Sequence, residues 1–124
     1  MPSLTLAPRL DNIAVARQFV MDAARPGVGD PDAVGVMASE LVTNVFVHAR
    51  TPVTLTVRLG PPVRVEVADG ATASSTFRRF LEHAPPTAEP TALGGRGLGI
   101  VHALATRVGL DIDPAGGKVV WFEV

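Results

Sequence analysis

Two short runs of alternating apolar and polar residues place the strongest constraint on how this chain can fold. Residues 53–59 read VTLTVRL and residues 63–68 read VRVEVA, with Gly60-Pro61-Pro62 between them. A period of two residues is typical of a strand with one buried face, and the intervening glycine and prolines favour a turn. The two runs therefore predict an antiparallel hairpin, whose apolar face other elements must cover.

Three segments with helical periodicity can supply that cover. Apolar residues recur at helical spacing over residues 9–25. A second helix is expected to begin after Asp30, which suits the N-cap position, and to end at about Ala49. A third is expected over residues 98–107, with Gly109 as its stop.

Further β-like runs lie at residues 3–6, 108–112 and 118–124, and the last two flank a glycine-containing turn. The predicted order is strand, two helices, two strands, helix, two strands. This order predicts an α+β fold, a two-layer sandwich with the helices on one face of a mainly antiparallel sheet. A length of 124 residues predicts one domain over residues 1–124.

Composition excludes several classes of function. The chain has no cysteine, which excludes disulfides, cysteine–zinc sites and thiol nucleophiles. Its 11 basic and 12 acidic residues give a net charge of −1, so charge gives no reason to expect binding to nucleic acid or to anionic membranes. No apolar run approaches the length of a membrane span and no signal peptide is recognisable, so we expect a cytoplasmic protein.

The second predicted helix carries an unusual polar stripe. Apolar side chains occupy most of the circumference of this helix, yet Glu40, Asn44 and His48 follow one another at intervals of four. A buried carboxylate and amide need partners, and a ligand or a metal ion could provide them. The carboxylate could act as a general base and the amide oxygen could bind Mg²⁺. The alternative is that the stripe is the solvent face of an amphipathic helix.

Asp69 and Gly70 end the predicted hairpin. An Asp-Gly pair often forms a turn; the alternative is that the Asp69 carboxylate accepts a hydrogen bond from a ligand such as an adenine amino group.

A glycine-rich segment precedes the third helix: Gly94, Gly95, Arg96, Gly97, Leu98 and Gly99. Glycines let backbone amides approach an anion, and a helix N-terminus favours negative charge. The spacing matches neither the dinucleotide fingerprint nor the P-loop. A flexible hinge is the alternative, with Arg96 either a phosphate-binding cation or simply solvated. Residues 71–93 are too many for a passive connector, and we expect them to form a lid.

Together these motifs resemble the ATPase superfamily of gyrase, chaperone, histidine-kinase and MutL proteins (GHKL). Residues 40–49 (ELVTNVFVHA) resemble its N-box helix, residues 65–70 (VEVADG) its first glycine box, and residues 94–101 its second. Residues 116–123 (GGKVVWFE) resemble the last hairpin of one branch, the small anti-sigma-factor serine kinase-like regulators. The resemblance spans essentially the whole chain.

The resemblance implies a Bergerat-type fold that binds ATP and Mg²⁺. Asp69 would accept from the adenine amino group, Asn44 would ligate Mg²⁺, and Glu40 would act as general base. The glycine-rich segment would hold the phosphates and residues 71–93 would form the ATP lid. The complete cofactor-binding set that this implies is Asn44, His48, Asp69, Gly70, Gly94, Gly95, Arg96, Gly97, Leu98 and Gly99.

By the same resemblance the protein would be an anti-sigma-type regulator and a serine-protein kinase. Its partners would be an anti-anti-sigma (STAS-type) antagonist, a sigma factor or both, and it would form a homodimer. Two departures keep a non-catalytic partner-binding module open as the alternative: residues 71–73 (ATA) do not continue the family's first glycine box, and Val119 has no hydroxyl where family members often carry threonine. A detached histidine-kinase catalytic domain acting in trans is a third reading.

Overall fold

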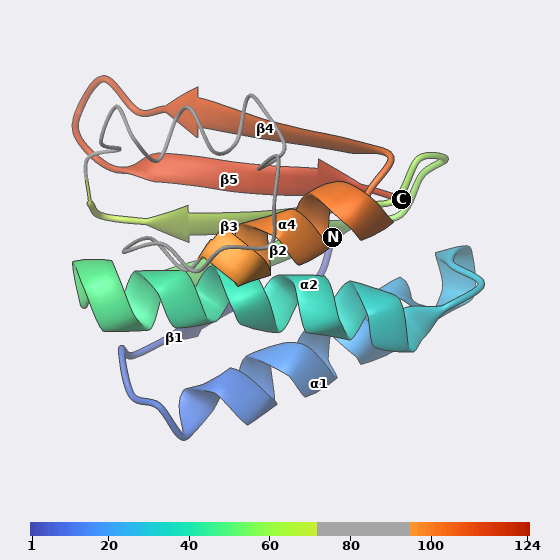
Figure 1. Cartoon of the computed structure of the whole chain (residues 1–124), viewed down its shortest axis with the longest axis horizontal. Coiled ribbons are helices and arrows are strands. Elements are labelled where there is room, and N and C mark those ends of the chain that lie inside the picture. Colours follow the sequence, from blue (N-terminus) through green and yellow to red (C-terminus); the bar gives the residue numbers. More distant parts are fainter. Residues whose placement is uncertain (72–94) are drawn as a thin grey trace.

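The computed structural model describes residues 1–71 and 95–124 as a five-stranded sheet covered by helices on one face (Figure 1). The elements are β1 (Ser3–Leu6), α1 (Asn12–Ala24), the 3₁₀ turn η1 (Arg25–Gly27), α2 (Pro31–Asn44), the π-helical turn η2 (Val45–Ala49), β2 (Val53–Arg58), β3 (Arg64–Asp69), α4 (Gly95–Leu104), β4 (Arg107–Ile112) and β5 (Lys118–Glu123). The predicted α+β fold is confirmed. None of the described helices combines the length and apolarity that a bilayer span requires.

The sheet is antiparallel throughout, with strand order β1-β2-β3-β5-β4. Both predicted hairpins, β2–β3 and β4–β5, are present. In the register of the three central strands, Asp69 is paired with Val53 of β2 on one side and with Lys118 of β5 on the other. The ends of β2 and β3 and the start of β5 are thereby brought together.

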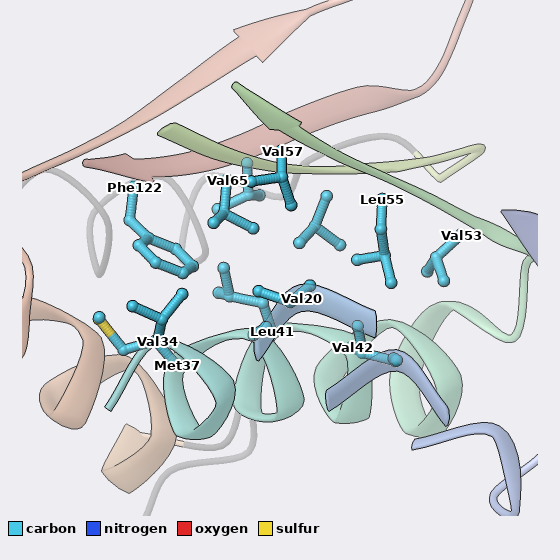
Figure 2. Close-up of a cluster of buried hydrophobic side chains, with 14 of the residues drawn as sticks. Val20, Val34, Met37, Leu41, Val42, Val53, Leu55, Val57, Val65 and Phe122 are labelled. Carbon is cyan, nitrogen blue, oxygen red and sulfur yellow. The ribbon is translucent and has the colours of Figure 1, made fainter. Parts of the chain in front are cut away.

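The alternation in the sequence determines which side chains face the helices. In β2 the buried side chains are those of Val53, Leu55 and Val57; β3 adds Val65 and Val67, and β5 adds Val120 and Phe122. These side chains pack against α1 and α2 in one apolar cluster (Figure 2). Figure 2 shows Val53 and Val42 toward the same end of the cluster, and Val42 is near the C-terminal end of α2. Because Asp69 is paired with Val53, Asp69 also lies near that end of the helix.

The helix boundaries confirm some predictions and correct others. Asp30 caps α2 as expected, because its Oδ1 accepts a hydrogen bond from the backbone N–H of Ala33 over 3.1 Å. The last predicted turn of that helix, up to Ala49, is π-helical and ends at Arg50, which has a left-handed φ of 57°.

The predicted helix over residues 98–107 was wrong at both ends. The observed helix α4 begins at Gly95 and ends at Leu104, and Arg107 belongs to β4. Gly109 lies inside β4 instead of ending a helix, because its missing side chain leaves room for Trp121 on β5. Except for Ala71, the expected lid over residues 71–93 lies outside the described residues.

Candidate functional site

Three of the predicted motifs meet at one end of the molecule. In Figure 1 the ends of α2 and β3 and the starts of α4 and β5 all lie toward the left side of the view. Helix α2 also packs against α4. Asn44, Asp69 and the glycine-rich start of α4 are therefore brought to the same end of the helix-covered sheet face.

The Asp69 carboxylate is the most constrained group at this end. Its Oδ1 accepts two hydrogen bonds, from the backbone N–H of Ala71 over 2.7 Å and from Lys118 Nζ over 2.9 Å. Its Oδ2 is buried and has no hydrogen-bond partner among the described residues. Leaving a buried acceptor unpaired costs about 1–3 kcal/mol, and the cost is higher for a charged group. The site thus holds an unused carboxylate oxygen that a ligand N–H could satisfy.

Lys118 forms a buried ion pair with this carboxylate. The Lys118 side chain is 8% exposed and that of Asp69 is 0% exposed. Lys118 was not a predicted site residue. Two signals could have found it: it is the chain's only lysine, and it occupies an inward position of β5 in the same alternation as Val120 and Phe122.

The glycines before β5 allow Lys118 to reach Asp69. Gly116 and Gly117 have φ values of 108° and 92°, which L side chains rarely adopt. A Cβ atom at Gly117 would also lie only 2.6 Å from the backbone oxygen of Asp69. Glycine at position 117 is therefore required by both backbone conformation and the close approach of β5 to β3.

A second link joins the end of β3 to the chain that follows α2. The backbone N–H of Gly70 donates to Thr51 Oγ1 over 3.2 Å. Thr51 follows the π-helical turn and precedes β2. This contact fixes the Asp69–Gly70 corner relative to the end of the helix that carries Asn44. Thr51 was not a predicted site residue.

The polar stripe predicted on the second helix is divided in the structure. Asn44 ends α2, and its Nδ2 is buried without a hydrogen-bond partner within the described part of the chain. Glu40 is half-buried one turn earlier, whereas His48 is exposed in the π-helical turn. The solvent-face reading of the stripe fits His48 and does not fit Asn44, whose buried amide favours the ligand reading.

The glycine-rich segment forms the first turns of α4 instead of a loop before it. Gly95 begins the helix and Gly97 and Gly99 follow within it, while Gly94 lies outside the described residues. A Cβ at Gly99 would meet no described atom within 4 Å. The first backbone N–H groups of an α-helix have no partner inside the helix. They can bind an anion such as a phosphate.

A metal ion at this site would take oxygen ligands. Mg²⁺ is commonly held by one or two protein oxygens together with substrate phosphates and waters. Among residues 1–71 and 95–124 no three His, Asp or Glu side chains gather into a metal-binding group. The amide oxygen of Asn44 suits a Mg²⁺ ion that is also bound by phosphate.

The sequence model of the family described as "Histidine kinase-like ATPase domain" matches residues 6–123. The solved structure of the RsbU and RsbW domains of Rv1364c from Mycobacterium tuberculosis superposes with a TM-score of 0.58 at 16% identity, covering 99% of this chain and 32% of that chain. This chain thus spans about a third of that one, and the likeness shows a shared fold. No curated protein matches the sequence significantly.

Proposed function

Because the chain belongs to the family of histidine kinase-like ATPase domains, we propose that it binds ATP with Mg²⁺ at the end of the sheet that holds Asp69. The observation that carries this proposal is the buried Asp69 carboxylate, whose Oδ2 has no partner among the described residues. The amino group of adenine is a donor of the kind that this oxygen lacks. Burial of an unpaired polar atom is costly, and a donor from a ligand would offset that cost.

The remaining contacts follow from the same arrangement. The backbone N–H groups at the start of α4 would bind phosphate oxygens, and the amide oxygen of Asn44 would bind Mg²⁺. The cation would neutralise phosphate charge. His48 is exposed and would contact the ligand from outside the buried part of the site.

We propose further that the protein is an anti-sigma-type regulator that phosphorylates a serine of a STAS-type antagonist. Glu40 lies one helical turn before Asn44 and is half-buried, which suits a general base beside bound phosphates. It would take the proton of the serine hydroxyl as that oxygen bonds to the γ-phosphorus and ADP leaves. The resemblance of residues 116–123 to the last hairpin of such regulators supports this assignment. A homodimer and a sigma-factor partner belong to the same proposal.

One observation favours a second candidate, a partner-binding module that does not turn over ATP. Lys118 already neutralises the Asp69 carboxylate, and a buried ion pair of this kind can serve the fold alone. On that reading Asp69 and Lys118 hold β3 to β5, and the protein acts through its surface.

Calorimetric titration with ATP, with and without Mg²⁺, separates the two candidates. The variants are Asp69→Asn and, as a matched control, Asp111→Asn, an exposed aspartate on the opposite face of the sheet. Loss of a hydrogen bond to a charged group costs about 1.5–3 kcal/mol, so Asp69→Asn should weaken ATP binding about tenfold or more. Asp111→Asn should bind as wild type does.

Asp69→Asn also removes the carboxylate charge from the buried pair with Lys118, so each variant is first checked for a cooperative unfolding transition. If folded wild-type protein does not bind ATP at millimolar concentration, the nucleotide site is rejected in favour of the partner-binding module.

A further inference from the structure

We infer that Lys118 is a specificity-determining residue. By occupying one carboxylate oxygen of Asp69, it leaves only the other oxygen to accept a hydrogen bond from the base, and so selects adenine over guanine. This inference rests on the proposed nucleotide site. It starts from the unequal state of the two carboxylate oxygens of Asp69: Oδ1 accepts from Lys118 and Ala71, whereas Oδ2 accepts from no described group.

The capacity of each oxygen determines what the carboxylate can still accept. An ionised carboxylate has about four lone-pair positions, two on each oxygen. The Lys118 Nζ at 2.9 Å and the Ala71 N–H at 2.7 Å use both positions of Oδ1. The carboxylate can therefore accept a hydrogen bond from a ligand only through Oδ2.

The purine bases differ in the number of donors that they present to such a group. The Watson–Crick edge of adenine has one amino donor beside the acceptor N1, and Oδ2 alone can satisfy it. Guanine has two neighbouring donors, N1–H and the 2-amino group, which match the two oxygens of a free carboxylate in the way that a bidentate pair does. With Oδ1 saturated, both donors of guanine would have to share Oδ2, which is a weaker arrangement than the bidentate pair and disfavours guanine binding.

The position of Lys118 is built into the fold. Its neighbours on the same face of β5 are apolar, and replacing a buried ion pair by apolar residues often leaves stability unchanged or higher. Stability alone therefore gives little reason for a lysine here. The Gly116–Gly117 turn and the close approach of Gly117 to the Asp69 backbone deliver its ammonium to Oδ1. If Lys118 determines which hydrogen bonds Asp69 can still accept, both the lysine at this position and the glycine turn that places it are explained.

The test compares Mg²⁺ complexes of ATP, GTP and ITP by calorimetry on wild type and on Lys118→Met. ITP carries the N1–H donor of guanine without the 2-amino group, so the GTP-to-ITP affinity ratio isolates the second donor. In wild type we expect ATP and ITP to bind more tightly than GTP. Lys118→Met returns one acceptor position to Oδ1, and GTP should gain about tenfold or more over ITP, the size of one good base contact.

The outcomes distinguish this inference from the function on which it rests. GTP binding more tightly than ITP in wild type, or a ratio that Lys118→Met leaves unchanged, overturns the inference while ATP binding stands. Absence of binding of all three nucleotides to folded wild type overturns both. If Lys118→Met does not fold, the wild-type order of GTP and ITP decides.

Discussion

Gly109 of β4 lies directly beneath the indole ring of Trp121 of β5, so closely that a Cβ atom at position 109 would overlap the ring. The guanidinium of Arg64 lies 3.8 Å from the centroid of the ring, and that of Arg107 lies 5.6 Å away. These residues lie on the sheet face opposite the helices. The glycine thus provides the space that lets a large aromatic ring lie flat on this face.

We expect Gly109→Ala to destabilise the protein by about 1–3 kcal/mol, the usual cost of overpacking. Urea unfolding followed by tryptophan fluorescence measures the effect, because Trp121 is the only tryptophan. Gly29→Ala is the matched control, since a Cβ there meets no described atom within 4 Å. Equal stability of the two variants would contradict the close packing of Gly109 against the ring.

We expect Lys118→Met to cost about 3–5 kcal/mol, because it leaves the Asp69 carboxylate buried without its cation. The double variant Asp69→Asn with Lys118→Met removes both charges and should be more stable than Lys118→Met alone. Urea denaturation of the three proteins checks this order. A double variant less stable than the single one would show that the two residues do not act as a pair.

Replacing the N-cap of α2 by Asp30→Ala should cost about 1 kcal/mol, because the backbone N–H of Ala33 loses its acceptor. Asp30→Ser is the control: its hydroxyl can cap the helix nearly as well. Thermal or urea unfolding measures both. If Asp30→Ser is as unstable as Asp30→Ala, the side-chain cap is not the source of the effect.

Asn44→Ala should remove the Mg²⁺-dependent part of ATP affinity and leave the Mg²⁺-independent part, because only the metal contact is lost. ATP titrations with and without Mg²⁺ measure the difference. Thr43→Ala, one residue earlier, is the control, because its hydroxyl donates to the backbone oxygen of Ser39 over 2.6 Å and is occupied within the helix. Unchanged Mg²⁺ dependence in Asn44→Ala would reject Asn44 as the metal ligand.

Glu40→Gln should leave ATP binding largely intact and lower phosphotransfer about 100-fold or more, the usual contribution of a general base. Transfer of labelled phosphate to a STAS-type antagonist measures the rate, and Asp32→Asn, exposed at the other end of the same helix, is the control. Full activity of Glu40→Gln would reject Glu40 as the base.

The sequence by itself determined the local elements. The alternation over residues 53–59 and 63–68 gave β2 and β3 and predicted which face is apolar, and Asp30 marked the start of α2. Such features depend on residues a few positions apart, so periodicity and capping patterns predict them. The boundaries of α4 were predicted less well, because glycines at the start of a helix resemble a loop in sequence.

Only the tertiary structure decided the features that depend on distant residues. Lys118 and Asp69 are 49 positions apart, and no local pattern relates them until β3 and β5 pair. The pairing of β4 with β5 likewise placed Gly109 under Trp121, so Gly109 lies within a strand and does not end a helix. Burial likewise separated Asn44 from His48 on one predicted stripe. Sequence patterns report the neighbours along a helix or strand, whereas strand register and packing determine which distant groups share a buried site.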